Sequence, residues 1–217
     1  MSLSRPPPVL IDGPAGKLQF LLSLPSGAPR GIALVSHPQP LLGGSPRHIV
    51  PHSAARRLGA AGWIAARPSF RGVDGSEGTY DHGIGEAEDA LAVAAHLRAQ
   101  HPGLPLALVG FSFGAHVYAR LACRLEAAAA PAAAIVLMGL PVGTVPGGRN
   151  YEAMPIPRRA LLLHGEEDAM APLSALLEWG RPRQHPVVVF PGTDHFFKGC
   201  LEQALDLVVA HLREAAP

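Results

Sequence analysis

Two hydrophobic patterns alternate along this chain. Short runs such as 31–35 and 134–138 are apolar at almost every position, as expected for strands that are covered on both faces. The segments between them are longer and place apolar residues at helical spacing. The runs predict strands at 17–25, 31–37, 63–70, 104–111, 132–140, 159–164 and 186–191. The longer segments predict helices at 47–61, 83–100, 113–126, 172–181 and 199–214.

This alternation predicts an α/β fold, in which a mostly parallel central sheet has helices on both faces. The chain shows no internal repeat and no long linker, and its 217 residues fit a single domain over residues 1–217. In sheets of this kind ligands bind beyond the carboxyl ends of the strands. The segments that follow the predicted strands are therefore the places where functional side chains are expected.

One predicted strand-to-helix junction carries a serine. The apolar run 106–109 leads into Gly-Phe-Ser-Phe-Gly at 110–114, and a helical pattern follows. Such a turn holds the serine in a strained conformation and lifts its hydroxyl off the sheet edge. Glycine at 110 and 114 removes side chains that would clash where strand and helix meet. The pentapeptide is a weak signal by itself, so its place at this junction is what indicates that Ser112 is a nucleophile.

A serine hydroxyl needs a base, ordinarily a histidine that a carboxylate orients. His195 fits this role because it lies on the loop after the last predicted strand. The loop after the preceding strand offers three carboxylates, Glu166, Glu167 and Asp168. The order along the chain is therefore serine, acid, histidine.

Five motifs in this order resemble those of the α/β-hydrolase superfamily, and more narrowly its small, lidless bacterial members of the predicted-hydrolase type. They lie at 36–44, 70–78, 110–114, 164–168 and 194–197, and the resemblance covers most of the chain, from residue 31 to residue 214. The resemblance implies Ser112 as nucleophile and His195 as base. It also selects Asp168 as the acid over Glu167, because the family's acid usually stands three residues after the glycine of His-Gly.

The resemblance further implies an oxyanion hole made of backbone N–H groups. One N–H should belong to Phe113, the residue after the nucleophile. The other should come from the loop after the strand at 31–37, where only His37 and Gln39 can donate because their neighbours are prolines. The family usually uses the residue two beyond the histidine, which favours Gln39. Many relatives have His-Gly where this chain has His-Pro. His37 itself could line the site or take a catalytic role, although an imidazole that fixes the loop by hydrogen bonds is the favoured interpretation.

Composition narrows the possible partners. The chain has 18 basic and 17 acidic residues and is 48% hydrophobic, so it is not a disordered chain and has no basic excess for nucleic acid. No apolar stretch approaches the length of a membrane span. Cys123 and Cys200 are the only cysteines, which suggests no disulfide framework and favours a cytoplasmic location. We expect a small-molecule acyl substrate, no nucleic-acid partner and no membrane; the sequence leaves the oligomeric state open.

Two patterns suggest other ligands. His48 and His52 stand four residues apart, as metal ligands on a helix do, but Pro51 favours a helix start that leaves His48 outside. The glycines of 72–78 lack the Gly-Lys-Ser/Thr ending of a phosphate loop. We therefore expect no metal and no cofactor. Arg71 could bind a substrate carboxylate, although a structural ion pair is the favoured interpretation.

Together these features predict a serine hydrolase that cleaves a carboxylic ester or thioester of a small soluble substrate. The same fold could instead cleave an amide or a carbon–carbon bond, or could serve as a binding module without turnover. The segment 141–157, where this superfamily commonly inserts a cap domain, is rich in proline and glycine. It predicts a loop and an open site, without a helical lid.

Overall fold

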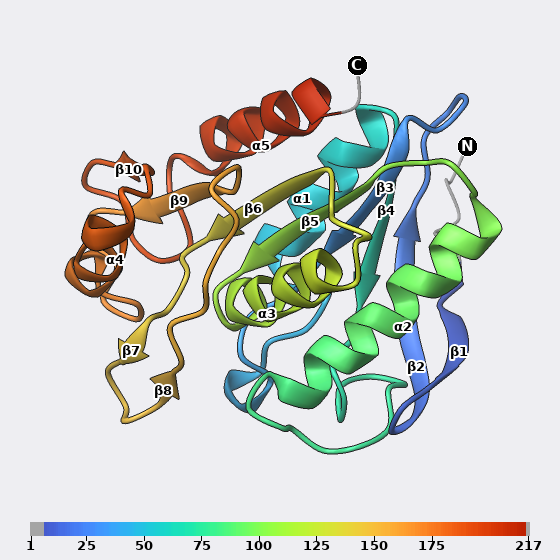
Figure 1. The fold of residues 1–217 in the computed structure, drawn as a ribbon, viewed down its shortest axis with the longest axis horizontal. Coiled ribbons are helices and arrows are strands. Elements are labelled where there is room, and N and C mark those ends of the chain that lie inside the picture. Colours follow the sequence, from blue (N-terminus) through green and yellow to red (C-terminus); the bar gives the residue numbers. More distant parts are fainter. Residues whose placement is uncertain (1–6, 216–217) are drawn as a thin grey trace.

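The computed structural model describes residues 7–215, and at its centre is an eight-stranded sheet with helices on both faces (Figure 1). The sheet strands are β1 (Val9–Gly13), β2 (Gly16–Ser23), β3 (Gly31–Val35), β4 (Trp63–Pro68), β5 (Leu106–Phe111), β6 (Ala134–Met138), β9 (Leu161–Gly165) and β10 (Val187–Phe190). The helices are α1 (Ile49–Ala60), α2 (Ile84–Gln100), α3 (Phe113–Ala127), α4 (Leu173–Gly180) and α5 (Leu201–Ala215), with short 3-10 turns at Pro40–Leu42 and Arg181–Arg183. The predicted fold class is confirmed.

The strand order is β1-β2-β4-β3-β5-β6-β9-β10. The six strands from β4 to β10 in this order are parallel, whereas β1 and β2 form an antiparallel hairpin that joins β4 antiparallel. Strand β5 is central, between β3 and β6. The carboxyl ends of β3, β5, β6, β9 and β10 therefore meet at one edge of the sheet, as such parallel sheets require.

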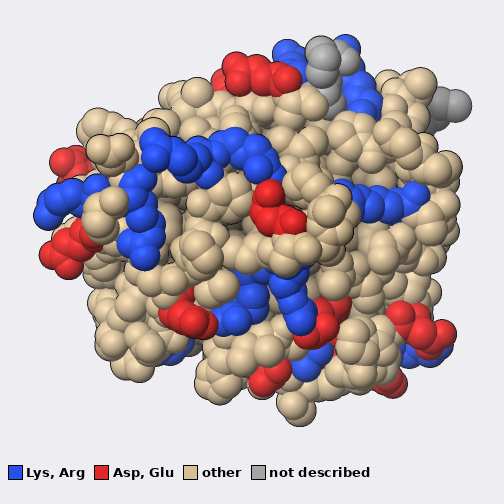
Figure 2. Space-filling model, viewed as in Figure 1, with Lys and Arg blue, Asp and Glu red and all other residues tan. Residues whose placement is uncertain are grey.

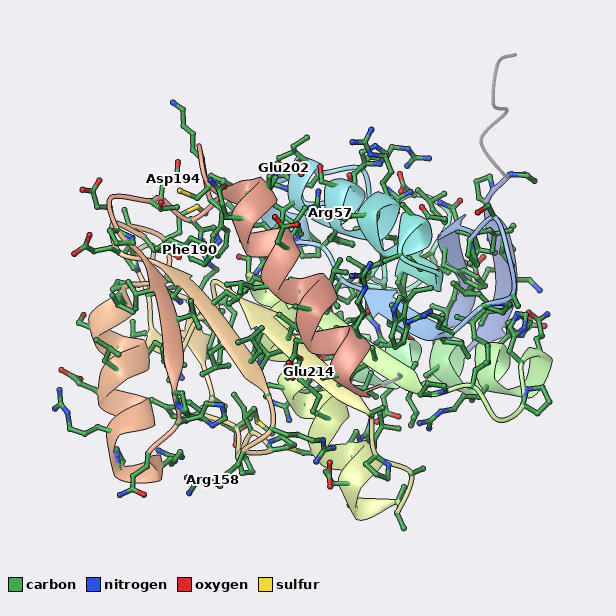
Figure 3. All side chains as sticks on the ribbon, turned by 90° about the horizontal axis from the view of Figure 1, so that it is seen from above. Arg57, Arg158, Phe190, Asp194, Glu202 and Glu214 are labelled. Atoms are coloured by element: carbon green, nitrogen blue, oxygen red, sulfur yellow. The ribbon has the colours of Figure 1, made fainter. Side chains whose placement is uncertain are left out.

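Each face of the sheet has its own apolar core. Helices α2 and α3 lie in front of the sheet in Figure 1 and pack on one face, together with Leu176 and Trp179 of α4. Helices α1 and α5 pack on the other face. Arg57 of α1 pairs with Glu202 of α5 at 2.8 Å (Figure 3). It also pairs with Asp206 on the same helix. These exposed ion pairs add little to stability, so burial of the two apolar cores holds the layers together.

The sequence pattern did not predict two small features. Strand β1 was missed because it lies at the sheet edge and is only partly buried. The segment 141–157 contains a small antiparallel hairpin, β7 (Gly143–Thr144) and β8 (Asn150–Tyr151). It contains no helix, so the expectation that no helical lid stands here is confirmed.

The surface carries no large field of one sign on the side that α2 and α3 cover. Figure 2 shows basic and acidic side chains interspersed there between wide uncharged areas. No helix within residues 7–215 is long and apolar enough to cross a membrane.

The contact between α3 and the end of β3 depends on a glycine. A Cβ atom on Gly114 would lie 2.6 Å from Cβ of Ser36 and 2.7 Å from the carbonyl oxygen of His37. These distances are shorter than real Cβ contacts, so only glycine lets the first turn of α3 approach the end of β3 this closely. Gly110 serves the same end within the turn, where a Cβ would lie 2.6 Å from Cα of Ala115.

We expect Gly114→Ala to lower the free energy of unfolding by about 1–3 kcal/mol, because the new methyl overpacks a rigid backbone contact. Urea unfolding should show a lower midpoint. Gly27→Ala is the matched control, since a Cβ there meets nothing within 4 Å. Equal midpoints for the two variants would contradict this account of the contact.

Candidate active site

The backbone of Ser112 has the strained conformation that the strand-to-helix turn predicts. Its φ is 57° and its ψ is −125°, in a region that side-chain-bearing residues rarely adopt. The Ser112 N–H donates to the carbonyl of Met138 at 2.9 Å, and the Ser112 carbonyl accepts from the N–H of Ala115 at 2.8 Å. These bonds tie the turn to the end of β6 and to the first turn of α3.

The structure brings Ser112, His195 and Asp168 into one hydrogen-bonded line. Oγ of Ser112 lies 2.7 Å from Nε2 of His195, and Nδ1 of His195 lies 2.6 Å from Oδ2 of Asp168. A carboxylate only accepts, so Nδ1 carries the ring proton and Nε2 is free to accept from the serine hydroxyl. All three residues are buried, and the imidazole is therefore held in the tautomer that can remove a proton from Ser112.

A close backbone contact between two loops, allowed by Gly165, places the acid beside the histidine. A Cβ on Gly165 would lie 2.4 Å from the carbonyl oxygen of Thr193 and 2.5 Å from that of Asp194. The loops after β9 and β10 are therefore in contact. A hydrogen bond from the N–H of Glu167 to the carbonyl of Thr193, at 3.0 Å, joins them as well. Glu166 and Glu167 are exposed, and the carboxylate that meets His195 is the third of the three, Asp168.

Both oxygens of the Asp168 carboxylate accept hydrogen bonds. Its Oδ1 accepts from the N–H groups of Met170 at 2.9 Å and Ala171 at 2.7 Å. Nε2 of His164 lies 2.7 Å from the carbonyl of Ala171 and 3.4 Å from Oδ2 of Asp168. Burial lowers the pKa of His164, so its ring is neutral with the proton on Nε2. These donors compensate the burial of a carboxylate and fix its direction.

His37 fixes the loop after β3. Its Nδ1–H donates to the carbonyl of Pro38 at 2.8 Å, and its Nε2 accepts from the N–H of Phe70 at 3.0 Å. Both bonds require a neutral imidazole. Burial lowers the pKa of His37 to about 4, against smaller opposing effects of Pro38 and Asp74, and so keeps the ring neutral at pH 7.

The N–H groups of Gln39 and Phe113 donate no hydrogen bond to another residue in the range 7–215. Phe113 is the first residue of α3, so its N–H has no partner within the helix. The Gln39 carbonyl accepts from Leu42 and Gly44, which bends the loop into a tight turn. Because Gly114 brings α3 against the end of β3, these two unpaired donors belong to neighbouring backbone segments beside Ser112.

The geometry agrees with the comparison to known proteins. No family model matches the chain. The solved structure of XC6422 from Xanthomonas campestris, an α/β serine hydrolase without a lid, is 31% identical, with a TM-score of 0.85 over 99% of this chain and 96% of the other. The chain belongs to the α/β-hydrolase superfamily. An α/β serine hydrolase homologue from Coxiella burnetii is 29% identical, with a TM-score of 0.80 over 98% of this chain and 100% of the other.

One further relative has no described function. The uncharacterized protein RP471 of Rickettsia prowazekii (strain Madrid E) is 28% identical in an alignment over 200 residues, which covers 88% of this chain and 82% of that protein. The match extends along most of both chains, so it concerns the whole hydrolase domain rather than one motif.

The other residues singled out in the sequence of this α/β-hydrolase have structural contacts. His48 stands just before α1, accepts from the N–H of Val50 at 3.4 Å and stacks on Phe111. Arg71 makes a bidentate ion pair with Asp89, at 2.8 and 2.9 Å. Its guanidinium therefore binds a carboxylate of the protein itself. Within the described range no group of three or more His, Cys, Asp or Glu side chains is placed to hold a metal ion.

Sequence reasoning missed three residues at the site of this hydrolase. His164 belongs to one of the motifs, but the motif does not predict that its Nε2 lies 3.4 Å from Oδ2 of Asp168. No motif predicts a role for Tyr80 or Tyr151, although both hydroxyl oxygens lie 3.3 Å from Nε2 of Gln39. A contact between residues so far apart in sequence leaves no local pattern. The only available signal was that the chain has just three tyrosines.

We expect the stability of this hydrolase to fall as the pH is lowered from 7 to 5. His37 and His116 both have a pKa of about 4 because they are buried, whereas an unfolded histidine titrates near 6.5. The unfolded state therefore binds more protons below pH 6.5, and each histidine should cost about 2 kcal/mol between pH 7 and pH 5. Urea unfolding at several pH values measures this loss.

The variant His37→Asn should show a smaller pH dependence than the wild type, because one of the buried histidines that contribute to it has been removed. His116→Asn should reduce the dependence in the same way. A free energy of unfolding that stays flat between pH 7 and pH 5 would contradict the burial of these rings as neutral groups.

Proposed function

We propose that this chain is a serine hydrolase that cleaves a carboxylic ester or thioester of a small soluble substrate. The observation that carries the proposal is the line of hydrogen bonds from Ser112 through His195 to Asp168. The hydrolase role is supported by the two solved relatives, of which one is described as a serine hydrolase and the other as a serine hydrolase homologue. The ester or thioester bond is the part that needs an experiment.

In the proposed reaction Oγ of Ser112 attacks the carbonyl carbon while Nε2 of His195 takes its proton. Asp168 keeps Nδ1 protonated and stabilises the imidazolium that forms. The N–H groups of Gln39 and Phe113 would donate to the developing oxyanion. His195 then protonates the leaving group, and a water molecule activated by the same ring releases the acyl group from Ser112.

The surroundings of Ser112 favour a small acyl group. The hairpin β7–β8 stands where a cap domain would enter. Apolar side chains that follow Gln39 and His195 in the sequence are exposed: Leu41 is 66% exposed, Leu42 57% and Phe196 37%. If an acyl chain lay against such side chains, they would contact it from one side only. A long chain would therefore bury little of its surface and gain little from each added methylene.

The partners follow from this proposal. A small acyl substrate needs neither a nucleic acid nor a membrane surface, and the proposed reaction needs no metal and no cofactor. A cytoplasmic location stays a prediction from the two unpaired cysteines.

We expect Ser112→Ala and His195→Ala each to lower kcat/KM for p-nitrophenyl acetate by at least about 10³-fold, because nucleophile and base act as one unit. Asp168→Asn should also cause a large loss, since an amide favours the wrong imidazole tautomer. Steady-state hydrolysis and labelling by a fluorophosphonate probe measure these effects.

Glu167→Gln is the matched control for the acid, because Glu167 is exposed and one residue away, and it should retain nearly full activity. A wild-type protein that hydrolyses no ester and is not labelled would favour a binding module. Loss of activity at Glu167 with retention at Asp168 would reassign the acid.

We expect the hydrolysis of p-nitrophenyl esters to be fastest for short acyl groups, with no rate increase above the micelle concentration of the longer esters. The reason is that we propose an open site, in which burial of up to about 0.8 kcal/mol per methylene would not be available to the far end of a long chain. Kinetics on acyl groups from two to sixteen carbons tests this expectation. A steep preference for the longest chains would show that an enclosed acyl tunnel forms after all.

A further inference from the structure

The two residues that would form the oxyanion hole are joined by the same pair of tyrosines. Nε2 of Gln39 donates to the hydroxyl oxygens of Tyr80 and Tyr151, each at 3.3 Å. The rings of these tyrosines flank the ring of Phe113, with centroid distances of 5.4 Å for Tyr80 and 6.4 Å for Tyr151. Each tyrosine therefore touches one proposed donor residue with its hydroxyl and the other with its ring.

The orientation of the Gln39 carboxamide follows from its neighbours. Its Oε1 accepts from the N–H of Leu41 at 3.4 Å, and an N–H can only donate. Nε2 must then face the two hydroxyl oxygens, which can accept. The side chain is nearly fully buried, with Gln39 4% exposed, so it cannot turn toward water without losing all three bonds.

The tyrosines reach this point from two different segments. Tyr80 lies before α2, and Tyr151 belongs to β8 of the small hairpin. Tyr151 also packs edge-on against His116 of α3, with a centroid distance of 5.2 Å. We call Tyr80 and Tyr151, with their contacts to Gln39 and Phe113, the clamp. The clamp joins the loop after β3, the start of α3, the segment before α2 and the hairpin.

We propose that Tyr80 and Tyr151 are positioning residues that set the distance between the N–H groups of Gln39 and Phe113. This inference rests on the proposed function, because it assigns a role within the same oxyanion hole. Oxyanion donors stabilise the transition state only when they are held close to the position where the charge develops. The hydroxyls act through the side chain of Gln39, whereas its backbone N–H is the group that would touch the substrate.

The test uses the three tyrosines of the chain as a matched set. Tyr80→Phe and Tyr151→Phe each remove one hydroxyl and keep the ring, and each should lower kcat for p-nitrophenyl acetate by about fivefold, a fraction of the 10²–10³ lost when an oxyanion donor is removed. KM should stay unchanged, because the lost interaction acts on the transition state.

Two further readouts separate positioning from a general structural effect. The inhibition constant of a trifluoromethyl ketone, which forms a tetrahedral oxyanion on serine, should rise in the same ratio as kcat/KM falls. Gln39→Met keeps the backbone N–H and removes the carboxamide, so it should reproduce the double Tyr80→Phe/Tyr151→Phe loss. Adding either tyrosine substitution to Gln39→Met should then have no further effect.

Tyr118→Phe is the control. Tyr118 is fully buried in α3, and its hydroxyl has no hydrogen-bond partner among residues 7–215, so this variant should keep wild-type kcat. Thermal unfolding of all variants identifies any that have lost stability.

The outcomes distinguish this inference from the proposed function. A wild-type protein that hydrolyses esters, with Tyr80→Phe and Tyr151→Phe variants of unchanged kcat and inhibitor affinity, overturns the clamp and leaves the hydrolase intact. The clamp is also overturned if the loss of kcat caused by a tyrosine substitution adds fully to the loss caused by Gln39→Met. The hydroxyls would then act independently of Gln39. A wild type that hydrolyses no ester overturns the proposed function and, with it, the clamp.

Discussion

The strained backbone of Ser112 is the constraint on which the rest of the site depends. A φ of 57° and a ψ of −125° are unfavourable by about 1–3 kcal/mol for a residue with a side chain. The conformation persists because β5 is the central strand, with β3 and β6 fixed on either side of it. Hydrogen bonds to Met138 at the end of β6 and to Ala115 in α3 leave the turn no relaxed alternative.

The remaining parts of the site are arranged around that turn by two backbone contacts. Gly114 lets α3 meet the end of β3, which places Phe113 next to the loop that carries Gln39. Gly165 lets the loop after β9 meet the loop after β10, which places Asp168 next to His195. In both places a glycine permits a backbone approach, and buried hydrogen bonds then fix the side chains that the approach brings together.

The sequence predicted those parts of the structure that depend on neighbouring residues. The parallel sheet followed from apolar runs covered on both faces, and the turn at Ser112 followed from its two glycines. The choice of Asp168 over Glu167 could not be made from residue types, because all three carboxylates of the loop have similar chemistry. It was made from the family motif.

The clamp around Gln39 could not be predicted in the same way. Its hydrogen bonds join residues 41 and 112 positions apart in the sequence, and neither tyrosine lies in a recognisable pattern. Strand β8, which carries Tyr151, is only two residues long and lies in a segment whose prolines and glycines indicate a loop. Such contacts arise from tertiary packing, which local patterns do not record.

The hairpin β7–β8 also has a consequence for how this fold can diversify. Its tip, at Pro146, Gly147 and Gly148, is exposed, and exposed tips of this kind tolerate inserted sequence. An insertion at the tip would leave the turn at Ser112 and the loops of Asp168 and His195 unchanged in sequence. It would nevertheless pull on Tyr151. Lengthening the hairpin into a lid would therefore couple movement of the lid to the geometry around Gln39, through the contact between Tyr151 and its side chain. In the proposed mechanism, substrate access and transition-state stabilisation would then change together.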